Sequence, residues 1–384
     1  MSITPLTQCD VVILGGGPAG VATALSLLKY NPALRVVIVE RSGYDYARIG
    51  ETLPPNARLL LEQLNIWPAF TQAGHLPAYG TCAIWGSPIM HTNESFFNLH
   101  GHGWHLNRAS FDAMLAQAAV QRGAMLYLRT RFLGCHQLSD GSWHLTVRTQ
   151  KSAPTQLNPR FVVDATGRLA WLARQQDAKR LIYDQLMGVA VLFQVDDDYA
   201  DTYALVETSP SGWWYSALLA GRRMMVVYMS DADLARRQQL KLPSSWLAHV
   251  RQTEHTWARV QKAHPLGRPI AYAAHTQRMQ PVVGENWLAV GDAASTFDPL
   301  SSQGIYKALH SGIFASYAIL DWFKGQTDAL QRYAALNERE FQQYLSVRAN
   351  YYALEQRWPN SRFWKRRHEF EPEVTNYHTH VNME

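Results

Sequence analysis

The first forty residues contain two short apolar runs separated by a stretch with helical spacing. Residues 10–14, DVVIL, are apolar up to a set of glycines, as buried parallel strands are. Residues 18–30 place Val21, Ala24, Leu25 and Leu28 on one helical face. Residues 34–39 form a second apolar run that ends at Glu40. This pattern predicts a strand–helix–strand unit with parallel strands.

Beyond this unit, the apolar pattern changes its period several times. Helical spacing is found in four segments: 56–65, 108–122, about 244–263, and most of the chain from about 303. Single strands are expected at 124–129, 143–149, 160–164 and 286–290. Between 185 and 230, four apolar runs predict an antiparallel sheet, with a hairpin turn at 220–223.

The order of these elements predicts the fold class. Parallel strands are interrupted by antiparallel ones and resume near 286, so one lobe is inserted into another. We predict an α/β fold with a Rossmann-type nucleotide-binding lobe, an inserted antiparallel β-sheet substrate lobe and a helical C-terminus. The expected bounds are 1–75, 105–175 and 280–325 for the first lobe, 76–104 and 176–279 for the second, and 326–384 for the C-terminal segment.

Composition narrows the class of protein. With 47% apolar and 17% charged residues, the 384-residue chain can bury a large core. Its three cysteines form no CxxC or His/Cys cluster, which disfavours a disulfide framework and a zinc site and favours a reducing compartment. The N-terminus has no signal-peptide pattern and no run of 18 uncharged apolar residues exists, so we expect a cytoplasmic protein without a membrane span.

The net charge of +5 does not by itself indicate nucleic acid, and no nucleic-acid-binding motif is present. Much of the excess lies near the C-terminus, interleaved with aromatic residues. Two interpretations stay open for this basic segment, a solvated helix end or a docking patch for an acidic partner. Its basic residues are Arg357, Arg362, Lys365, Arg366 and Arg367.

The glycines after the first strand form a GxGxxG motif, GGGPAG, at 15–20. Gly15 permits the tight turn, Gly17 lets the backbone approach a pyrophosphate, and Gly20 lets helix and strand pack closely. The helix N-terminus offers free N–H groups to phosphates, and Glu40 would accept hydrogen bonds from an adenosine ribose. The expected dinucleotide-binding residues here are Gly15, Gly17, Pro18, Ala19, Gly20, Glu40 and Arg41.

A second motif, GDAA at 291–294, follows the strand at 286–290. An aspartate there can bind the ribityl hydroxyls of a flavin, and the DPLSSQG loop then leads into a helix whose N-terminus can point at the flavin ring. The two motifs together favour FAD. The candidates from this second region are Gly291, Asp292, Gln303, Gly304 and Ile305.

Four motifs carry a family resemblance: GGGPAG, LNRASFDAML, VVDATGR and GDAASTFDPLSSQG. Together they resemble the para-hydroxybenzoate-hydroxylase-like flavoproteins. The resemblance implies that Arg108 lies near the FAD phosphates or ribityl chain and that Pro299 lies near the reactive face of the flavin. It adds Asp164, from VVDATGR, to the cofactor-binding candidates.

GETLPP at 50–55 and the DPLSSQGI loop resemble flavin-dependent halogenases, but three departures argue against halogenation. Halogenases of this kind need a lysine after the GExxxP segment, and no lysine occurs between Lys29 and Lys151. Tryptophan halogenases place a glutamate where this chain has Ser301. Their GWxWxIP signature is degraded here to GWWYSAL.

The segments GETLPPNARLLLEQL, SGWWYSALL and GDAASTFDPLSSQGI are more similar to the LodB/GoxB group of maturation flavoproteins. That resemblance implies hydroxylation of a specific Trp in the precursor of a quinone-cofactor amine or amino-acid oxidase, through a flavin C4a-hydroperoxide. It implies non-covalent FAD, O2, and electrons from NAD(P)H or from a separate flavin reductase.

Several residues are candidates for the chemistry itself. Glu51 is either a general base or a structural carboxylate, and the loop with Pro299, Ser301 and Ser302 is the expected source of hydrogen-bond donors. Alternation along a strand places Trp213 and Tyr215 on one face, as candidates for the substrate pocket, and Trp214 on the other.

Other readings stay open. His91, His100, His102 and His105 form a local cluster, but they lack a third acidic or Cys ligand nearby, so no metal is expected. The alternative functions are an oxygenase or halogenase of a small indole or aromatic metabolite, a flavin-carrying chaperone without turnover, and a reductase of the geranylgeranyl type.

Overall fold

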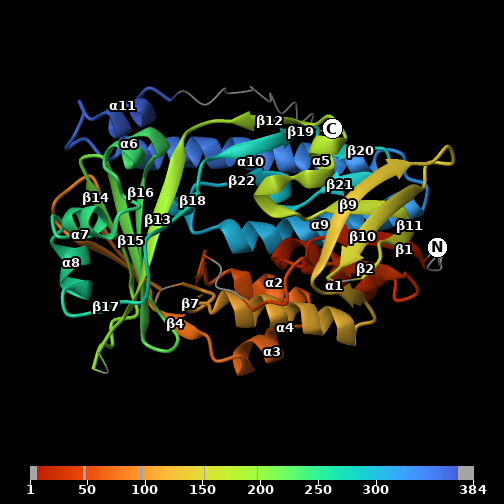
Figure 1. Cartoon of the computed structure of the whole chain (residues 1–384), viewed down its shortest axis with the longest axis horizontal. Helices are drawn as coiled ribbons and strands as arrows, with labels where there is room; N and C mark the ends of the chain where they lie inside the picture. The colour runs from red at the N-terminus through yellow and green to blue at the C-terminus, as the bar shows by residue number, and fades with distance from the viewer. Residues whose placement is uncertain (1–6, 46–48, 96–97, 151, 197, 371–384) are drawn as a thin grey trace, which may run out of the picture.

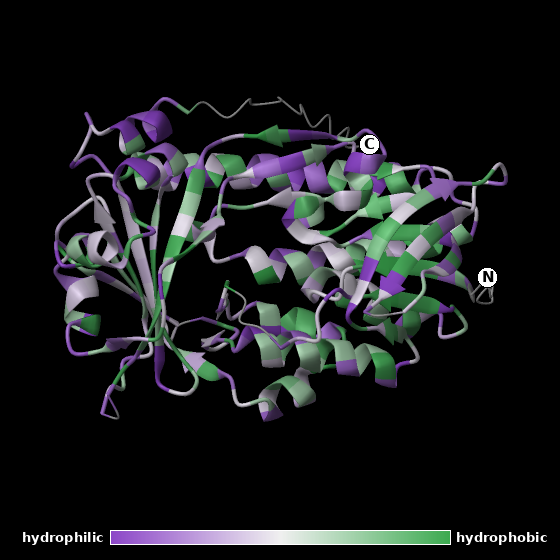
Figure 2. Cartoon of the chain, viewed as in Figure 1, coloured by the Kyte–Doolittle hydropathy of each residue, from purple (hydrophilic) through white to green (hydrophobic). Residues whose placement is uncertain are grey.

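The computed structural model describes residues 7–45, 49–95, 98–150, 152–196 and 198–370, and it contains two large sheets held together by long helices (Figure 1). The predicted α/β class, with an antiparallel second sheet and a helical C-terminus, is confirmed. Figure 2 shows that the strands of the first sheet are strongly apolar, as expected for strands covered on both faces.

The first sheet has the order β20-β21-β11-β1-β2-β8, and its central strands are parallel. The predicted strand–helix–strand unit forms its centre, because β1 and β2 bury almost every side chain and α1 returns the chain across the sheet. A hairpin, β9–β10, extends from β11. Its strands are β1 (Thr7–Leu14), β2 (Val36–Val39), β8 (Met125–Tyr127), β9 (Thr130–Gln137), β10 (Trp143–Thr149), β11 (Thr155–Asp164), β20 (Val283–Gly284) and β21 (Trp287–Ala289).

The second sheet has the order β17-β13-β16-β15-β14-β5-β6, with β18 also paired to β13. The four strands predicted between 185 and 230 are all present, and the segment at 220–223 joins β15 to β16. Its strands are β5 (Gly80–Ile84), β6 (His91–Glu94), β13 (Leu186–Gln194), β14 (Ala204–Ser209), β15 (Gly212–Leu219), β16 (Arg223–Asp231), β17 (His264–Pro265) and β18 (Ile270–Ala273).

Two small three-stranded sheets lie between the large ones. One brings the GETLPP segment beside the chain that precedes Arg108, through the order β3-β7-β4. The other has the order β12-β19-β22. Their strands are β3 (Thr52–Leu53), β4 (Leu76–Ala78), β7 (Gly103–His105), β12 (Lys179–Ile182), β19 (Gln277–Gln280) and β22 (Ser295–Thr296).

Helices cover both sheets, and α1 packs closely on α9. A side chain at Gly312 of α9 would lie 2.4 Å from the carbonyl oxygen of Ala19, so glycine is needed at this contact. The main helices are α1 (Pro18–Tyr30), α2 (Ala57–Gln63), α3 (Trp67–Gln72), α4 (Arg108–Gln121), α5 (Trp171–Gln175), α6 (Ala232–Arg237), α7 (Pro243–Val250), α8 (His255–Val260), α9 (Gly304–Phe323), α10 (Ala329–Ala353) and α11 (Arg362–His368). Three 3-10 turns are η2 (Gly167–Leu169), η3 (Gly291–Ala293) and η4 (Pro299–Ser301).

Several elements differ from the sequence prediction. The stretch at 244–263 forms two helices, α7 and α8, instead of one. The eight-residue strand β9 and the short helices α3, α5 and α6 were not predicted. Nor were the short strands β3 to β7, β12, β17 to β20 and β22, because runs this short carry little periodicity. Within the described residues, no helix has the length and apolar character that crossing a bilayer would require.

Candidate functional site

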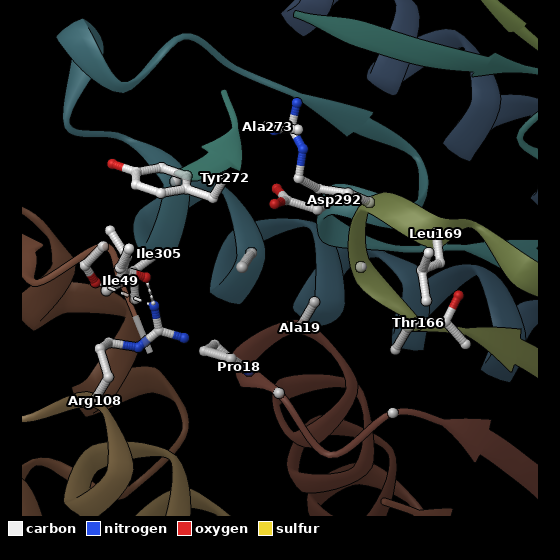
Figure 3. Close-up of a pocket in the computed structure, with 18 of the residues that line it drawn as sticks. Pro18, Ala19, Ile49, Arg108, Thr166, Leu169, Tyr272, Ala273, Asp292 and Ile305 are labelled. Atoms are coloured by element: carbon white, nitrogen blue, oxygen red, sulfur yellow. Dashed lines mark hydrogen bonds between the residues drawn. The ribbon is translucent and has the colours of Figure 1, made fainter. Parts of the chain in front are cut away.

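A cavity of about 900 Å³ lies between the two large sheets (Figure 3). Its wall combines the glycine loop after β1, the GETLPP segment, the start of α9 and one face of the antiparallel sheet. In Figure 3, Pro18, Ala19 and Arg108 lie on one side of the space, and Asp292 and Tyr272 lie on the other. The sequence motifs that were predicted to act together therefore meet at one place.

The glycine loop has the backbone of a dinucleotide site. Gly15 has φ +118°, and a side chain there would lie 2.2 Å from the carbonyl oxygen of Ala165. A side chain at Gly20 would lie 2.1 Å from the oxygen of Gly15, whereas one at Gly17 would meet nothing within 4 Å. Gly15 and Gly20 are therefore required by packing, and Gly17 leaves open space over the N-terminus of α1.

Glu40 ties this loop to β2. One carboxylate oxygen accepts from the backbone N–H of Gly16 at 2.8 Å, and the other accepts from the N–H and the hydroxyl of Ser42 at 2.8 and 2.5 Å. The Tyr44 hydroxyl donates to the oxygen of Gly16 at 2.7 Å. Glu40 lines the cavity while it fixes the turn, so the predicted ribose acid also has a structural role.

Asp292 is held between two cations. Lys307, one turn into α9, donates to Asp292 Oδ1 at 2.9 Å and also to the carbonyl oxygen of Ser295. Burial opposes the ionisation of Asp292, but Lys307 and then Arg168 outweigh it and hold its pKa below the ordinary value. Asp292 is therefore an anion, and a carboxylate that faces the cavity can accept hydrogen bonds from hydroxyl groups.

Arg108 fastens the segment before β3. Its Nη1 donates to the carbonyl oxygens of Ile49 and Gly50 at 2.9 and 3.1 Å, and its guanidinium pairs with buried Asp112. The side chain lines the cavity beside Pro18, as Figure 3 shows. It thus adds a positive charge near the N-terminus of α1.

Glu51 is buried at the cavity wall, with 3% of its surface exposed. Its Oε1 has no hydrogen-bond partner among the described residues. Burial raises the pKa of Glu51 from 4.5 to about 7, against the hydrogen bond from Gly50 and the charge of Arg108. Glu51 precedes strand β3, so a structural role as a helix cap does not apply to this carboxylate.

One face of β15 forms the cavity wall opposite the glycine loop. Trp213 and Tyr215 line the cavity, while Trp214 points to the other side and stacks on Tyr228, so the predicted alternation is confirmed. Tyr215 shares a hydrogen bond of 2.6 Å with Thr52. The hydroxyl of Tyr272, from β18, is buried at this wall without a hydrogen-bond partner among the described residues.

The DPLSSQG loop is fixed by its own aspartate. Asp298 is 1% exposed, and it accepts from the N–H of Leu300 at 2.9 Å and from Arg348 and Tyr352 of α10 at 3.3 and 2.8 Å. This network presents Pro299 and Ser302 to the cavity, just before the N-terminus of α9. Two helix N-termini, those of α1 and α9, therefore meet the same space.

Most of the predicted site residues lie at this cavity. Those that line it are Gly15, Gly17, Pro18, Ala19, Glu40, Arg41, Glu51, Arg108, Trp213, Tyr215, Asp292, Pro299, Ser302, Gly304 and Ile305. Gly20 and Gly291 are packed behind it, and Gln303 precedes the first residue of α9. Ser301 turns its hydroxyl to the carbonyl oxygen of Asp298.

Asp164 has a different place from the one predicted. It is fully buried at the end of β11, and its carboxylate accepts from Thr166 and from the backbone N–H of Ala173. It holds the turn that follows the strand and does not line the cavity. VVDATGR contributes Thr166, Gly167 and Arg168 to the cavity wall instead.

Sequence reasoning missed three functional candidates: Arg168, Tyr272 and Lys307. Arg168 is the last residue of the VVDATGR motif, from which only Asp164 was taken as a candidate. Lys307 lies three residues after Gly304, so helical geometry could have placed it one turn inside α9. Tyr272 lies on a four-residue strand without a motif, and nothing in the sequence marked it.

The histidine cluster and the basic C-terminal segment are now placed. His105 is buried and shares a hydrogen bond of 3.0 Å with the carbonyl oxygen of Thr202, and the described residues contain no group of three or more metal-ligating side chains. Arg366 and Arg367 pair with Asp231. Arg367 is 4% exposed and is part of the core, whereas Arg362 and Lys365 are exposed, so both interpretations stay open for those two residues.

The cavity suits FAD in the chemistry of its lining. An open backbone at Gly17 and the N-terminus of α1 fit the diphosphate, and the anion of Asp292 fits the ribityl hydroxyls. The aromatic face of β15 and the N-terminus of α9 lie at the end where the ring system would be.

Comparison with known proteins agrees with this assignment. The model of the tryptophan halogenase family matches residues 10–78 and 74–383. A putative FAD-dependent oxidoreductase, LodB of Marinomonas mediterranea, is 32% identical over 94% of this chain and 97% of its own length. A 1H-pyrrole-2-carbonyl-[peptidyl-carrier protein] brominase of Pseudoalteromonas luteoviolacea is 26% identical over 81% of this chain and 77% of its own.

Solved structures show the same fold. The myxobacterial chondrochloren halogenase CndH superposes with a TM-score of 0.87 at 20% identity, covering 96% of this chain and 87% of its own. The peptidyl tryptophan dihydroxylase QhpG, essential for tryptophylquinone cofactor biogenesis, superposes with a TM-score of 0.73 at 23% identity, covering 97% and 81%. With a family match across nearly the whole chain, the protein belongs to the tryptophan halogenase family and is a LodB-like, FAD-dependent oxidoreductase.

Proposed function

We propose that this protein is an FAD-dependent monooxygenase that hydroxylates a specific Trp in the precursor of a quinone-cofactor amine or amino-acid oxidase. The similarity to LodB along almost the full length of both chains supports the subfamily. The fold shared with QhpG, whose substrate is a peptidyl tryptophan, supports the substrate class.

The observation that carries the choice of chemistry is the lining of the cavity. It contains a buried acid, Glu51, with a free oxygen, but no lysine among the described residues. The lysine relay of the halogenases has no counterpart here, whereas direct oxygen transfer needs only a base and an apolar wall. One cavity joins the glycine loop to Trp213 and Tyr215, so the substrate ring can lie against the flavin.

Bound FAD would supply activated oxygen after two electrons arrive from NAD(P)H or from a separate reductase. One oxygen atom of O2 enters the indole ring and the other leaves as water. Glu51 then takes the proton that the hydroxylated ring carbon must lose to become aromatic again, and a pKa of about 7 suits that task at neutral pH.

The test is co-expression with a candidate oxidase precursor, followed by mass spectrometry of its tryptophan-containing peptides. We expect one Trp to gain one or two oxygen atoms, with heavy-isotope label incorporated from O2 and not from water. Glu51→Gln should lower the rate by about 10²- to 10⁴-fold. Glu62→Gln, at an exposed pair with Arg58, is the matched control and should leave the rate unchanged.

Two results would overturn the proposal. Turnover or halogenation of free indoles, with an unmodified precursor, would move the assignment to small-molecule chemistry. Tight binding of the precursor without O2 consumption would indicate a chaperone.

A further inference from the structure

A connected group of oxidisable side chains runs from the cavity to the surface, behind the wall formed by Trp213. The ring of Trp213 lies 6.2 Å from that of Trp85, which lies 5.6 Å from Tyr352 and 5.5 Å from Trp364. Trp364 in turn lies 6.1 Å from Trp358. These five residues are called the aromatic chain below.

The two ends of the aromatic chain have different surroundings. Trp213 lines the cavity together with Pro299 and Ile305, and it is 1% exposed. Trp85 and Trp358 are only half-buried, so solvent reaches both. The middle members, Tyr352 and Trp364, are fully enclosed. The chain therefore has one entrance, at the flavin end of the cavity, and two exits.

Hydrogen bonds link Trp213 and Tyr352, the first members of the aromatic chain to lose an electron, to a carboxylate that can accept a proton. Trp213 Nε1 donates to the Tyr352 hydroxyl at 3.0 Å, and that hydroxyl donates to Asp298 Oδ2 at 2.8 Å. A phenol that loses an electron becomes strongly acidic, so it needs a base within hydrogen-bond distance. Burial raises the pKa of Asp298 against the charge of Arg348, which makes this carboxylate a better acceptor for the phenolic proton.

We propose that the aromatic chain conducts oxidising equivalents out of the cavity when reduced flavin meets O2 without a substrate. A one-electron oxidant of the reactive-oxygen class takes an electron from Trp213. Tyr352 then returns an electron to Trp213 and gives its proton to Asp298. Trp85 reduces Tyr352 and the proton returns from Asp298. A thiol in solution then gives one electron to Trp85, loses its proton and becomes a thiyl radical.

Charge favours one exit over the other. The Arg357 guanidinium, which pairs with Glu355 on its other side, lies 4.6 Å from the ring centre of Trp358, and the nearer positive charge opposes a second one on the ring. The oxidising equivalent should therefore leave mainly through Trp85. This inference concerns the fate of oxidant and does not depend on which substrate the enzyme hydroxylates.

The antiparallel sheet supplies a matched control. Trp214 is also 1% exposed on β15, but it faces the opposite side, where its ring stacks on Tyr228 at 4.5 Å and meets Trp246 at 5.2 Å. Trp214 lies on the same strand as Trp213, is buried to the same degree and also contacts other aromatic rings, but it does not line the cavity. Replacing Trp214 therefore tests the effect of losing a buried indole without interrupting the chain.

Laser flash photolysis of the oxidised, FAD-loaded protein tests the chain without any turnover, because photoexcited FAD serves as the one-electron oxidant. We expect a long-lived absorption of oxidised Trp in the native protein. Trp213→Phe should abolish its yield. Trp85→Phe should shorten its lifetime by an order of magnitude or more, Trp358→Phe should have a smaller effect, and Trp85→Tyr should restore the lifetime because tyrosine is also oxidisable.

Tyr352→Phe keeps the ring and removes the phenolic hydroxyl that links Trp213 to Asp298, so it should slow the chain even where Trp213→Phe fails to fold. Trp214→Phe should behave as the native protein does. The proposal is overturned if Trp85→Phe and Tyr352→Phe leave the lifetime unchanged, or if Trp214→Phe shortens it as much as Trp85→Phe. Peptide mapping after substrate-free aerobic reduction should find oxidised Trp85 and unmodified Trp214, and the reverse distribution would also contradict it.

Discussion

Glu51 is a buried carboxyl group with a raised pKa, and we propose that it acts as the base of the reaction. A carboxyl whose pKa is raised by folding, here from 4.5 to about 7, holds its proton more tightly in the folded state than in the unfolded one. Folding is therefore favoured at low pH, and the stability of the apoprotein should fall as pH rises from about 4.5 to about 7. The shift corresponds to about 3 kcal/mol at most. Denaturant unfolding across this range measures it.

Glu51→Gln supplies the control for that pH dependence. The amide does not titrate, so its stability curve should be flatter between the two pH values. Equal slopes for the native protein and the variant would show that Glu51 is ionised in the folded state.

Two glycines of the nucleotide loop differ in what they contribute. Gly15 is required for packing, whereas Gly17 should matter for cofactor binding. Gly15→Ala places a methyl group against Ala165 at a positive φ, so it should cost at least about 2 kcal/mol of unfolding free energy. Gly17→Ala meets only open space and should leave the apoprotein's thermal unfolding nearly unchanged. Its methyl group would occupy the phosphate position, so FAD affinity should fall by about tenfold or more. FAD titration of both variants checks this, and a normal affinity for Gly17→Ala would place the diphosphate elsewhere.

Single residues were predictable where backbone geometry restricts the residue type. Gly15 and Gly20 belong to a motif because only glycine fits those contacts. The double role of Glu40 and the encounter of Asp292 with Arg168 depend on residues far apart in sequence. No local pattern contains that information, which also explains why Asp164 was expected at the cofactor and Tyr272 was missed.

β3 pairs with β7, and the segment just before β3 is fastened at the cavity by the side chain of Arg108. Arg108→Leu would release the carbonyl oxygens of Ile49 and Gly50 and remove the guanidinium that pairs with the buried carboxylate of Asp112. We expect a loss of about 3–5 kcal/mol and faster hydrogen exchange at 49–55. Arg58→Leu breaks an exposed pair on α2 and should change neither quantity by much. Unchanged exchange at 49–55 in Arg108→Leu would show that β7 alone fixes the segment.

Elements were predictable where burial is uniform or periodic over several residues. β1, β2 and β13 to β16 were found for this reason. The boundary between α7 and α8 was not predicted, because it depends on Glu207 of β14. This buried carboxylate accepts from the backbone N–H groups of Glu254, His255 and Thr256 and so starts a new helix there. Because the capping residue lies on a distant strand, the sequence of α8 itself does not show where this helix begins.

At the scale of the whole molecule, a buried ion pair joins the C-terminal helix α11 to the antiparallel sheet. Arg367 Nη2 lies 2.9 Å from Asp231 Oδ1, and both side chains are almost fully enclosed. Arg367→Met should cost about 3–5 kcal/mol, because it leaves a buried carboxylate with less compensation. Arg362, whose side chain is 52% exposed and lies 3.5 Å from Asp233, should contribute about 1 kcal/mol or less when replaced by Met. Equal losses for the two variants would indicate that the helix is held by its aromatic contacts alone.

The cofactor cavity takes its walls from nearly the whole length of the chain. Its lining begins at Leu14 and ends at Ala308, and Asp298 needs Arg348 and Tyr352 of α10 for its side-chain contacts beyond its own loop. During synthesis, a ribosome must therefore release almost the entire polypeptide before any FAD site exists, although the glycine loop emerges first. Loading of the flavin should be a late, post-translational event, and nascent chains arrested before α10 should compete poorly for free FAD.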